Sequence, residues 1–307
     1  MLALKIIAAL LLVLLAGGIV MGYFVMRAGC LGSRKEPVAV GTPDRPLFVD
    51  GINEGKRWFF SQAPEEVEIL SHDELRLHGY YLSGSTNNTL IVMHGYHSGA
   101  AHDTAPMLRF YHELGFNLLL PDQRAHGKSE GKYLTFGILE SRDVCGWIDF
   151  LNQRQRPDNI FLTGSSMGGA TVCMTALHDL PDNVRGIIAD CPFGDPTELY
   201  AYTMASRTKA PSAPVIYFCS IWTRILGGWK FNDVVYSDYV RAQLPLLILH
   251  GDNDRTVPHR MSERIFEYYG GEKQYELFPD CAHVYAYLSD PSRYRRLASD
   301  FIRKYSK

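Results

Sequence analysis

Residues 159–168 read NIFLTGSSMG, and the predicted architecture is built outward from them. The first five form a short apolar run typical of a buried strand, and a helix-length segment opens at Met167. A serine between a strand and a helix needs very small neighbours two positions to either side, because larger side chains would clash where the backbone reverses. Gly164 and Gly168 hold these positions around Ser166. The stretch therefore predicts a sharp turn that presents Ser166 at the end of a strand.

Similar strands and helices are predicted on both sides of this turn. The other short apolar runs are at 89–93, 117–121, 185–189, 245–249 and 275–278. The helix-length stretches are at 103–114, 139–152, 167–177, 259–269 and 290–305. Residues 67–70 and 75–82 look like an antiparallel hairpin that precedes this series. Alternating buried strands and helices predict an α/β fold with a doubly wound, mostly parallel sheet.

The N-terminus carries an uncharged run of 21 residues, from Ile6 to Met26. At about 1.5 Å per residue such a helix spans the hydrocarbon of a bilayer. We therefore predict that residues 1–26 form a single-pass membrane anchor. A cleaved signal peptide is the competing interpretation, but the run continues past the small residues at 16–18, which favours an anchor.

The side of the membrane stays open. Lys5 flanks one end of the run, whereas Arg27, Arg34 and Lys35 follow the other end. The larger number of cations favours a cytoplasmic C-terminal domain. One early lysine is enough for the opposite orientation, so the sequence leaves both orientations of the anchor open.

Three further segments are predicted after the anchor. Residues 27–64 are rich in glycine and proline with little periodicity, so they predict a tether. Residues 65–307 form the α/β domain. Within it, residues 193–243 separate two strands by a stretch too long for a simple connection and rich in aromatic residues. We predict an inserted helical lid there, which either packs on the domain or faces an apolar substrate.

Composition excludes several classes of function. The chain has 31 lysine and arginine residues against 33 aspartate and glutamate residues, without a basic cluster, so a nucleic-acid partner is not expected. Six cysteines without a CxxC pair predict neither a disulfide scaffold nor a zinc knuckle. His94, His97 and His102 do not have the spacing of a standard zinc site. No metal and no cofactor are expected.

A serine hydroxyl needs a base, and the base needs an orienting carboxylate, before the serine can act as a nucleophile. Asp254 follows the strand at 245–249, and His283 follows the strand at 275–278. Both therefore lie at the same sheet edge as Ser166, in the chain order serine, aspartate, histidine. Asp254 is preferred to Asp252, because Asp252 is close enough to the strand end to bond turn amides locally.

An oxyanion hole is expected beside the serine. One donor is the backbone N–H of Met167, the residue after Ser166. The other should come from the loop that follows the strand at 89–93, where Gly95 permits close approach of the backbone and Tyr96 supplies the N–H.

Over residues 65–305 the chain resembles the α/β-hydrolase superfamily. It looks most like the lysophospholipase, esterase and serine-aminopeptidase branch in its membrane-anchored form. The matching stretches are at 94–96, 122–129, 164–168, 190–193, 251–258 and 280–283. The family usually has Arg-Gly-His-Gly within the second stretch, where this chain has alanine at Ala125.

The resemblance implies a serine hydrolase that cleaves acyl esters through an acyl-enzyme, with a small-molecule or lipid-like acyl substrate. Thioesters belong to the same chemistry. A serine peptidase on the same fold is an alternative, which an acidic pocket gripping a peptide terminus would favour. A non-catalytic binding protein that retains the fold is a second alternative, against which a complete triad argues.

Overall fold

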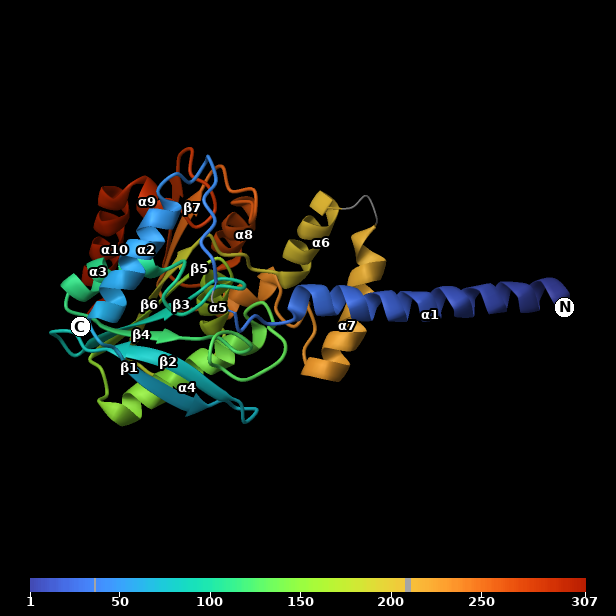
Figure 1. Cartoon of the computed structure of the whole chain (residues 1–307), viewed down its shortest axis with the longest axis horizontal. Coiled ribbons are helices and arrows are strands. Elements are labelled where there is room, and N and C mark those ends of the chain that lie inside the picture. The colour runs from blue at the N-terminus through green and yellow to red at the C-terminus, as the bar shows by residue number, and fades with distance from the viewer. Residues whose placement is uncertain (36, 208–210) are drawn as a thin grey trace. The chain divides into compact units, whose positions relative to one another are not determined.

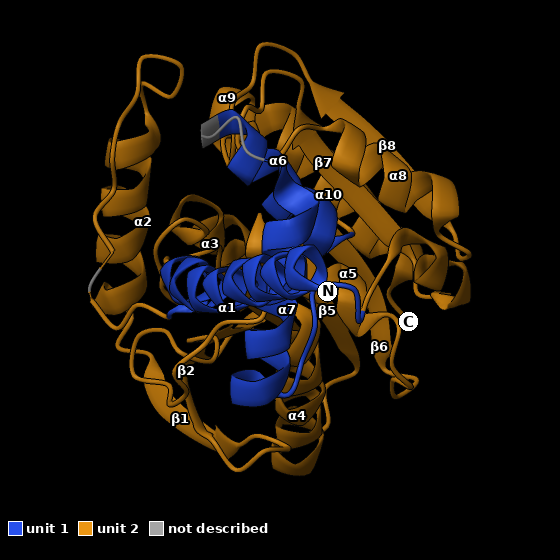
Figure 2. Ribbon diagram, turned by 90° about the vertical axis from the view of Figure 1, so that its right-hand side faces the viewer, with its two compact units in different colours: residues 1–31, 195–233 blue, residues 32–194, 234–307 orange. Residues whose placement is uncertain are grey.

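The computed structural model describes residues 1–35, 37–207 and 211–307. Position 36 of the predicted tether and positions 208–210 of the predicted insertion lie outside the described residues. The chain divides into two compact units, coloured in Figure 2. The smaller unit combines Met1–Leu31 with Asp195–Asp233, and the larger combines Gly32–Gly194 with Val234–Lys307.

The described part of the larger unit is built on one eight-stranded sheet, in the order β1-β2-β4-β3-β5-β6-β7-β8. Its strands are β1 Glu65–Leu70, β2 Arg76–Leu82, β3 Asn88–Met93, β4 Asn117–Pro121, β5 Asn159–Ser165, β6 Val184–Asp190, β7 Leu246–Gly251 and β8 Lys273–Phe278. β2 pairs antiparallel with β1 and with β4, and the remaining pairs are parallel. The predicted hairpin and the mostly parallel sheet are thereby confirmed.

Helices cover both faces of this sheet (Figure 1). They are α2 Phe48–Ser61, α3 Ala105–Glu113, α4 Ile138–Arg154, α5 Met167–Thr175, α8 Arg260–Tyr268, α9 Ala286–Ser289 and α10 Pro291–Tyr305, with a 3-10 turn at Tyr236–Arg241. α2, α3, α9 and α10 enclose a core with one face of the sheet, to which β3 contributes Leu90 and Val92. Ile91 and Met93 point to the opposite face and are buried as well, so both faces of β3 are covered.

The prediction of a tether over residues 27–64 is wrong for Phe48–Ser61, which form the helix α2. The apolar positions Phe48, Ile52 and Phe59 recur with the spacing of one helix face and are buried in the core. A Cβ on Gly55 would lie 2.3 Å from the carbonyl oxygen of Ala105, so α2 packs closely on the start of α3. The glycines and prolines around this segment obscured its helical periodicity.

Because α2 belongs to the core, its buried and exposed phenylalanines should differ. Phe59 is fully buried, whereas its neighbour Phe60 is 44% exposed. We expect Phe59→Leu to lower the free energy of unfolding by about 1–2 kcal/mol through lost packing. Phe60→Leu should have little effect on the urea midpoint. Equal midpoints for the two variants would mean that α2 is a loose tether.

The smaller unit contains α1 Leu2–Cys30, α6 Pro196–Arg207 and α7 Ser212–Gly227. α6 and α7 form most of the insertion predicted over residues 193–243, while residues from Val234 onward belong to the larger unit. Among the described residues, α1 is the one helix long and apolar enough to cross a membrane. A signal sequence has the same properties, so length and composition leave both interpretations of the N-terminus in place.

Candidate active site

Ser166 lies at the junction of β5 and α5. Its φ and ψ are 56° and −117°, a backbone conformation that a non-glycine residue adopts at a cost. A Cβ on Gly164 would lie 2.5 Å from the backbone of Gly168, and a Cβ on Gly168 would lie 2.0 Å from the carbonyl oxygen of Met93. Both glycines are therefore required by close backbone contacts at the turn.

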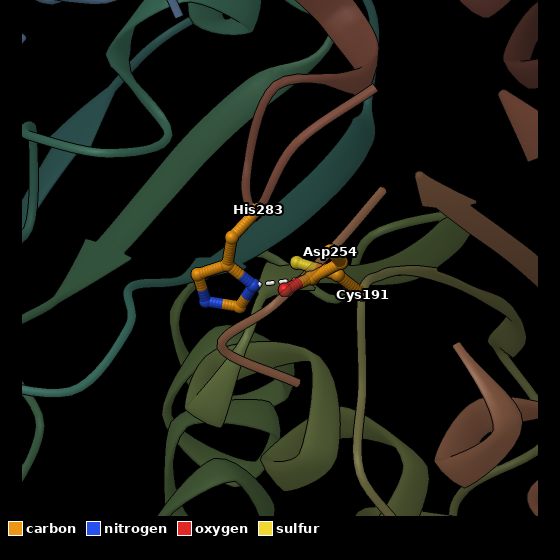
Figure 3. A group of neighbouring side chains, drawn as sticks. All are labelled: Cys191, Asp254 and His283. Atoms are coloured by element: carbon orange, nitrogen blue, oxygen red, sulfur yellow. Dashed lines mark hydrogen bonds and ion pairs between the residues drawn. The ribbon is translucent and has the colours of Figure 1, made fainter. Parts of the chain in front are cut away.

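The structure brings Ser166, His283 and Asp254 together at the carboxyl edge of the sheet. His283 Nε2 lies 2.9 Å from Ser166 Oγ, and His283 Nδ1 lies 2.6 Å from Asp254 Oδ2. Figure 3 shows the imidazole of His283 directed at the Asp254 carboxylate. The three side chains follow β5, β8 and β7, so residues far apart in sequence form one continuous hydrogen-bonded chain.

Asp254 is buried and remains ionised. Burial opposes ionisation, but the charge of His283 and the hydrogen bonds from His250 and His283 hold the pKa of this carboxyl well below its usual range. Asp254 Oδ1 also accepts the backbone N–H groups of Thr256 at 2.8 Å and Val257 at 2.9 Å. Asp252, by contrast, is exposed. The turn amides that were expected to hold Asp252 therefore bind Asp254 instead.

His250, which belongs to none of the predicted motifs, lies behind Asp254. Its Nε2 is 3.2 Å from Asp254 Oδ2 and 2.9 Å from the carbonyl oxygen of Val257. Both partners are acceptors, so Nε2 carries the proton. Nδ1 contacts Ser262 Oγ at 2.7 Å. A histidine at the end of the buried apolar strand β7 was the signal that could have identified it.

The Cys191 thiol packs beside the Asp254–His283 pair (Figure 3). Its Sγ, an Asp254 carboxylate oxygen and an imidazole nitrogen of His283 all lie within 4.8 Å of one another, close enough to surround a metal ion. Burial, reinforced by nearby carboxylates, holds the pKa of the Cys191 thiol well above its ordinary value. Because the thiolate is the form that binds metals and attacks carbonyls, Cys191 fits a packing role at this place.

The loop after β3 runs beside Ser166. A Cβ on Gly95 would lie 3.5 Å from Ser166 Cβ. Asp103 holds this loop, since its two carboxylate oxygens accept the Gly95 N–H at 2.8 Å and the Ser98 hydroxyl at 2.6 Å. Tyr96 follows Gly95, and Met167 occupies the first turn of α5, where backbone N–H groups lack intrahelical partners. The two expected oxyanion donors thus belong to segments that adjoin the serine.

A second loop, after β4, supports the first. His94 Nε2 accepts the Gln123 N–H at 3.0 Å, and His126 Nε2 accepts the His97 N–H at 3.2 Å. Within this loop Ala125 has a φ of 63°, a left-handed conformation that glycine adopts most easily. This conformation gives a physical reason for the glycine that is usual at this position in the α/β-hydrolases that the chain resembles. In this chain, Ala125 adopts it.

Comparisons with known proteins place the fold. A sequence profile of the family described as "Serine aminopeptidase, S33" matches residues 84–218. A solved esterase from Pyrococcus furiosus superimposes with a TM-score of 0.66 at 22% identity, covering 90% of this chain and all of the esterase. The chain therefore has the α/β-hydrolase fold.

The relatives of the chain include a named lipase and proteins whose activity is not described. The chain is 28% identical to YqkD of Bacillus subtilis over 73% of its own length and 74% of that protein. It is 24% identical to bem46 of Schizosaccharomyces pombe, covering 79% and 78% of the two chains. A thermostable monoacylglycerol lipase from a Bacillus strain is 25% identical, covering 66% and 83%. Together these findings support hydrolase activity in general terms.

Proposed function

We propose that this α/β-hydrolase is a serine hydrolase that cleaves acyl esters through an acyl-enzyme intermediate. One observation carries the proposal, namely the hydrogen-bonded chain from Ser166 Oγ through His283 to Asp254, with distances of 2.9 and 2.6 Å. A buried carboxylate that stays ionised beside a histidine is what nucleophilic activation of a serine requires.

The proposed reaction has two halves. In the first, Ser166 Oγ attacks the acyl carbonyl carbon while His283 Nε2 takes the hydroxyl proton, and His283 then gives that proton to the departing alcohol. In the second half, water attacks the acyl-serine, and the same nitrogen takes a proton from the water and returns it to Ser166. The oxyanion formed in each half accepts hydrogen bonds from the backbone N–H groups of Met167 and Tyr96. Asp254 stabilises the imidazolium throughout.

Acyl esters of apolar or lipid-like acids are the substrates that we propose. The monoacylglycerol lipase among the relatives and the esterase among the solved structures support ester cleavage. The proposed anchor at residues 1–26 would hold the enzyme at a membrane, where such esters are concentrated. The profile described as a serine aminopeptidase supports the peptidase alternative, which is therefore part of the test.

A substrate series on the purified full chain in detergent tests this proposal. We expect hydrolysis of p-nitrophenyl esters from acetyl to palmitoyl and of monoacylglycerol, and no release of p-nitroaniline from aminoacyl anilides. Turnover of the anilides at rates above the esters would replace the esterase proposal with the peptidase. No turnover of either class by folded protein would favour the non-catalytic alternative.

His250 is proposed as a positioning residue for Asp254. Because a hydrogen bond to a buried charge is worth about 1.5–3 kcal/mol, we expect His250→Phe to lower kcat by about 10-fold or more with KM nearly unchanged. His250→Gln, which keeps an N–H donor near the Nε2 position, should recover part of the loss. Steady-state kinetics on a soluble ester measures both effects, and equal kcat values for the Phe and Gln variants would contradict this role.

A further inference from the structure

The surroundings of α1 change along its length. All residues from Leu2 to Ala16 are exposed. Beyond them the buried positions recur every fourth residue, at Gly18, Gly22, Met26 and Cys30. This spacing places them on one face of the helix. The first half of α1 is therefore exposed and, apart from Lys5, apolar, and the second half has one packed face.

α7 packs on the two glycines of that face. A Cβ on Gly18 would lie 2.4 Å from the ring of Phe218, and a Cβ on Gly22 would lie 2.7 Å from the backbone carbon of Phe218. Small residues four positions apart allow two helix backbones to approach closely, a pattern typical of helix pairs in membranes. Gly17 provides the contrast, since a Cβ there would meet no atom within 4 Å.

Side chains of the insertion also hydrogen bond to the backbone of α1. Trp222 Nε1 donates to the carbonyl oxygen of Ile19 at 2.8 Å, and the Tyr200 hydroxyl donates to that of Val25 at 3.0 Å. These contacts fix α7 and α6 at the level of residues 18–26 of α1. That level is the C-terminal end of the apolar run.

This level corresponds to a membrane interface if α1 spans the bilayer. A span of about 20 residues that begins at Ile6, directly after Lys5, ends near Val25. Tyr23 and Trp222 then stand at its end, with ring centroids 5.1 Å apart, as tyrosine and tryptophan commonly do at headgroup depth. Arg27 follows one turn later, where a cation can reach phosphate groups.

The free face of α7 suits the same environment. Among the sixteen residues of α7 the one charged side chain is Arg224, while Tyr217 and Ile225 are 65% and 64% exposed. These three residues border a groove of about 740 Å³ between α6 and α7, lined also by Ile216, Ile221 and Phe231. Exposed apolar side chains around an apolar groove are unfavourable in water and typical of an interfacial helix.

We propose that α7 is a second membrane-contacting helix, and that acyl chains of bilayer phospholipids cover its free face and enter the groove between α6 and α7. The proposal rests on the membrane anchor of the proposed function, and on the packing of α7 against α1, whose Val20 and Phe24 are exposed at the level of this contact. The α6–α7 insertion is then held at the lipid surface by the glycine contacts of α1.

Depth-resolved quenching on the full chain in phosphatidylcholine vesicles tests this proposal. A polarity-sensitive fluorophore is attached at Tyr217→Cys or Ile225→Cys, with Leu14→Cys as the mid-span reference and Gln274→Cys as the exposed reference on the larger unit. We expect lipids with a shallow doxyl group to quench positions 217 and 225 about threefold more than position 274, and deep doxyl groups to quench position 14 most.

Two results would overturn the proposal. Quenching at position 14 with none at positions 217 and 225 would place α1 in the bilayer and α7 in water. No quenching at any position would refute the anchor as well. Neither result alters the ester hydrolysis expected in detergent, so failure here is distinguishable from failure of the catalytic proposal.

A matched pair of glycine variants tests what holds α7 there. In the Tyr217→Cys background, Gly22→Leu forces α7 away from α1 and should reduce shallow quenching by about twofold or more, whereas Gly17→Leu should leave it unchanged. Unchanged quenching with Gly22→Leu would contradict the role of the glycine contacts.

Discussion

Ser166→Ala is expected to lower kcat for a soluble p-nitrophenyl ester by at least about 10³-fold, the scale on which loss of a serine nucleophile acts. The alanine side chain removes the one oxygen that lies 2.9 Å from His283 Nε2. It leaves the strained turn and its glycines in place. The loss should therefore appear in kcat, with binding of substrate largely retained.

Ser165→Ala is the matched control for this experiment. Ser165 precedes the nucleophile, is almost completely buried at the end of β5, and has an Oγ without a hydrogen-bond partner among the described residues. Its replacement should leave kcat within a few-fold of the unchanged chain. Equal losses in the two variants would indicate damage to the turn rather than removal of a nucleophile.

Arg124→Ala should produce the largest loss of stability among the substitutions considered. The Arg124 guanidinium is 3% exposed and binds both carboxylate oxygens of Asp143, at 2.7 and 2.6 Å. It also binds both carboxylate oxygens of Asp73, at 2.9 and 3.1 Å. Removing the cation leaves the buried Asp143 without a partner, which costs about 3–5 kcal/mol of unfolding free energy.

Arg76→Ala is the surface comparison. Arg76 pairs with Glu130 at 2.6 Å, but its side chain is 67% exposed, so water screens the pair. Chemical denaturation should show a large drop in midpoint for Arg124→Ala and almost none for Arg76→Ala. Adding Asp143→Leu to Arg124→Ala should recover part of the loss, because the unpaired buried charge is then gone. A small effect of Arg124→Ala alone would contradict this expectation, because it would mean that water replaces the guanidinium beside Asp143 at little cost.

The sheet and the turn around Ser166 could be predicted because each depends on a local pattern. Buried parallel strands leave short apolar runs in the sequence, and the turn requires glycines two positions before and after the serine. Both patterns can be recognised without knowing which residues they contact. The positions of Asp254 and His283 after two strands then placed them at the same edge as Ser166, and the structure brings the three side chains within hydrogen-bonding distance.

Other features depend on partners that a linear pattern does not reveal. The helix α2 was missed because glycines and prolines around it outweighed the spacing of Ile52 and Phe59. The turn amides bind Asp254 rather than Asp252 because the backbone turns back at Thr256 and Val257. The contact of Gly22 with Phe218 joins segments almost two hundred residues apart, and only the fold reveals it.

Mapping the site of covalent modification tests the catalytic account most directly. The full chain is treated in detergent with a fluorophosphonate, which reacts with activated serines, and the adduct is located by tandem mass spectrometry. The account predicts an adduct on Ser166 alone, absent from Ser166→Ala and present in Ser165→Ala. An adduct on another residue, or none on folded protein that carries all three side chains, would contradict it.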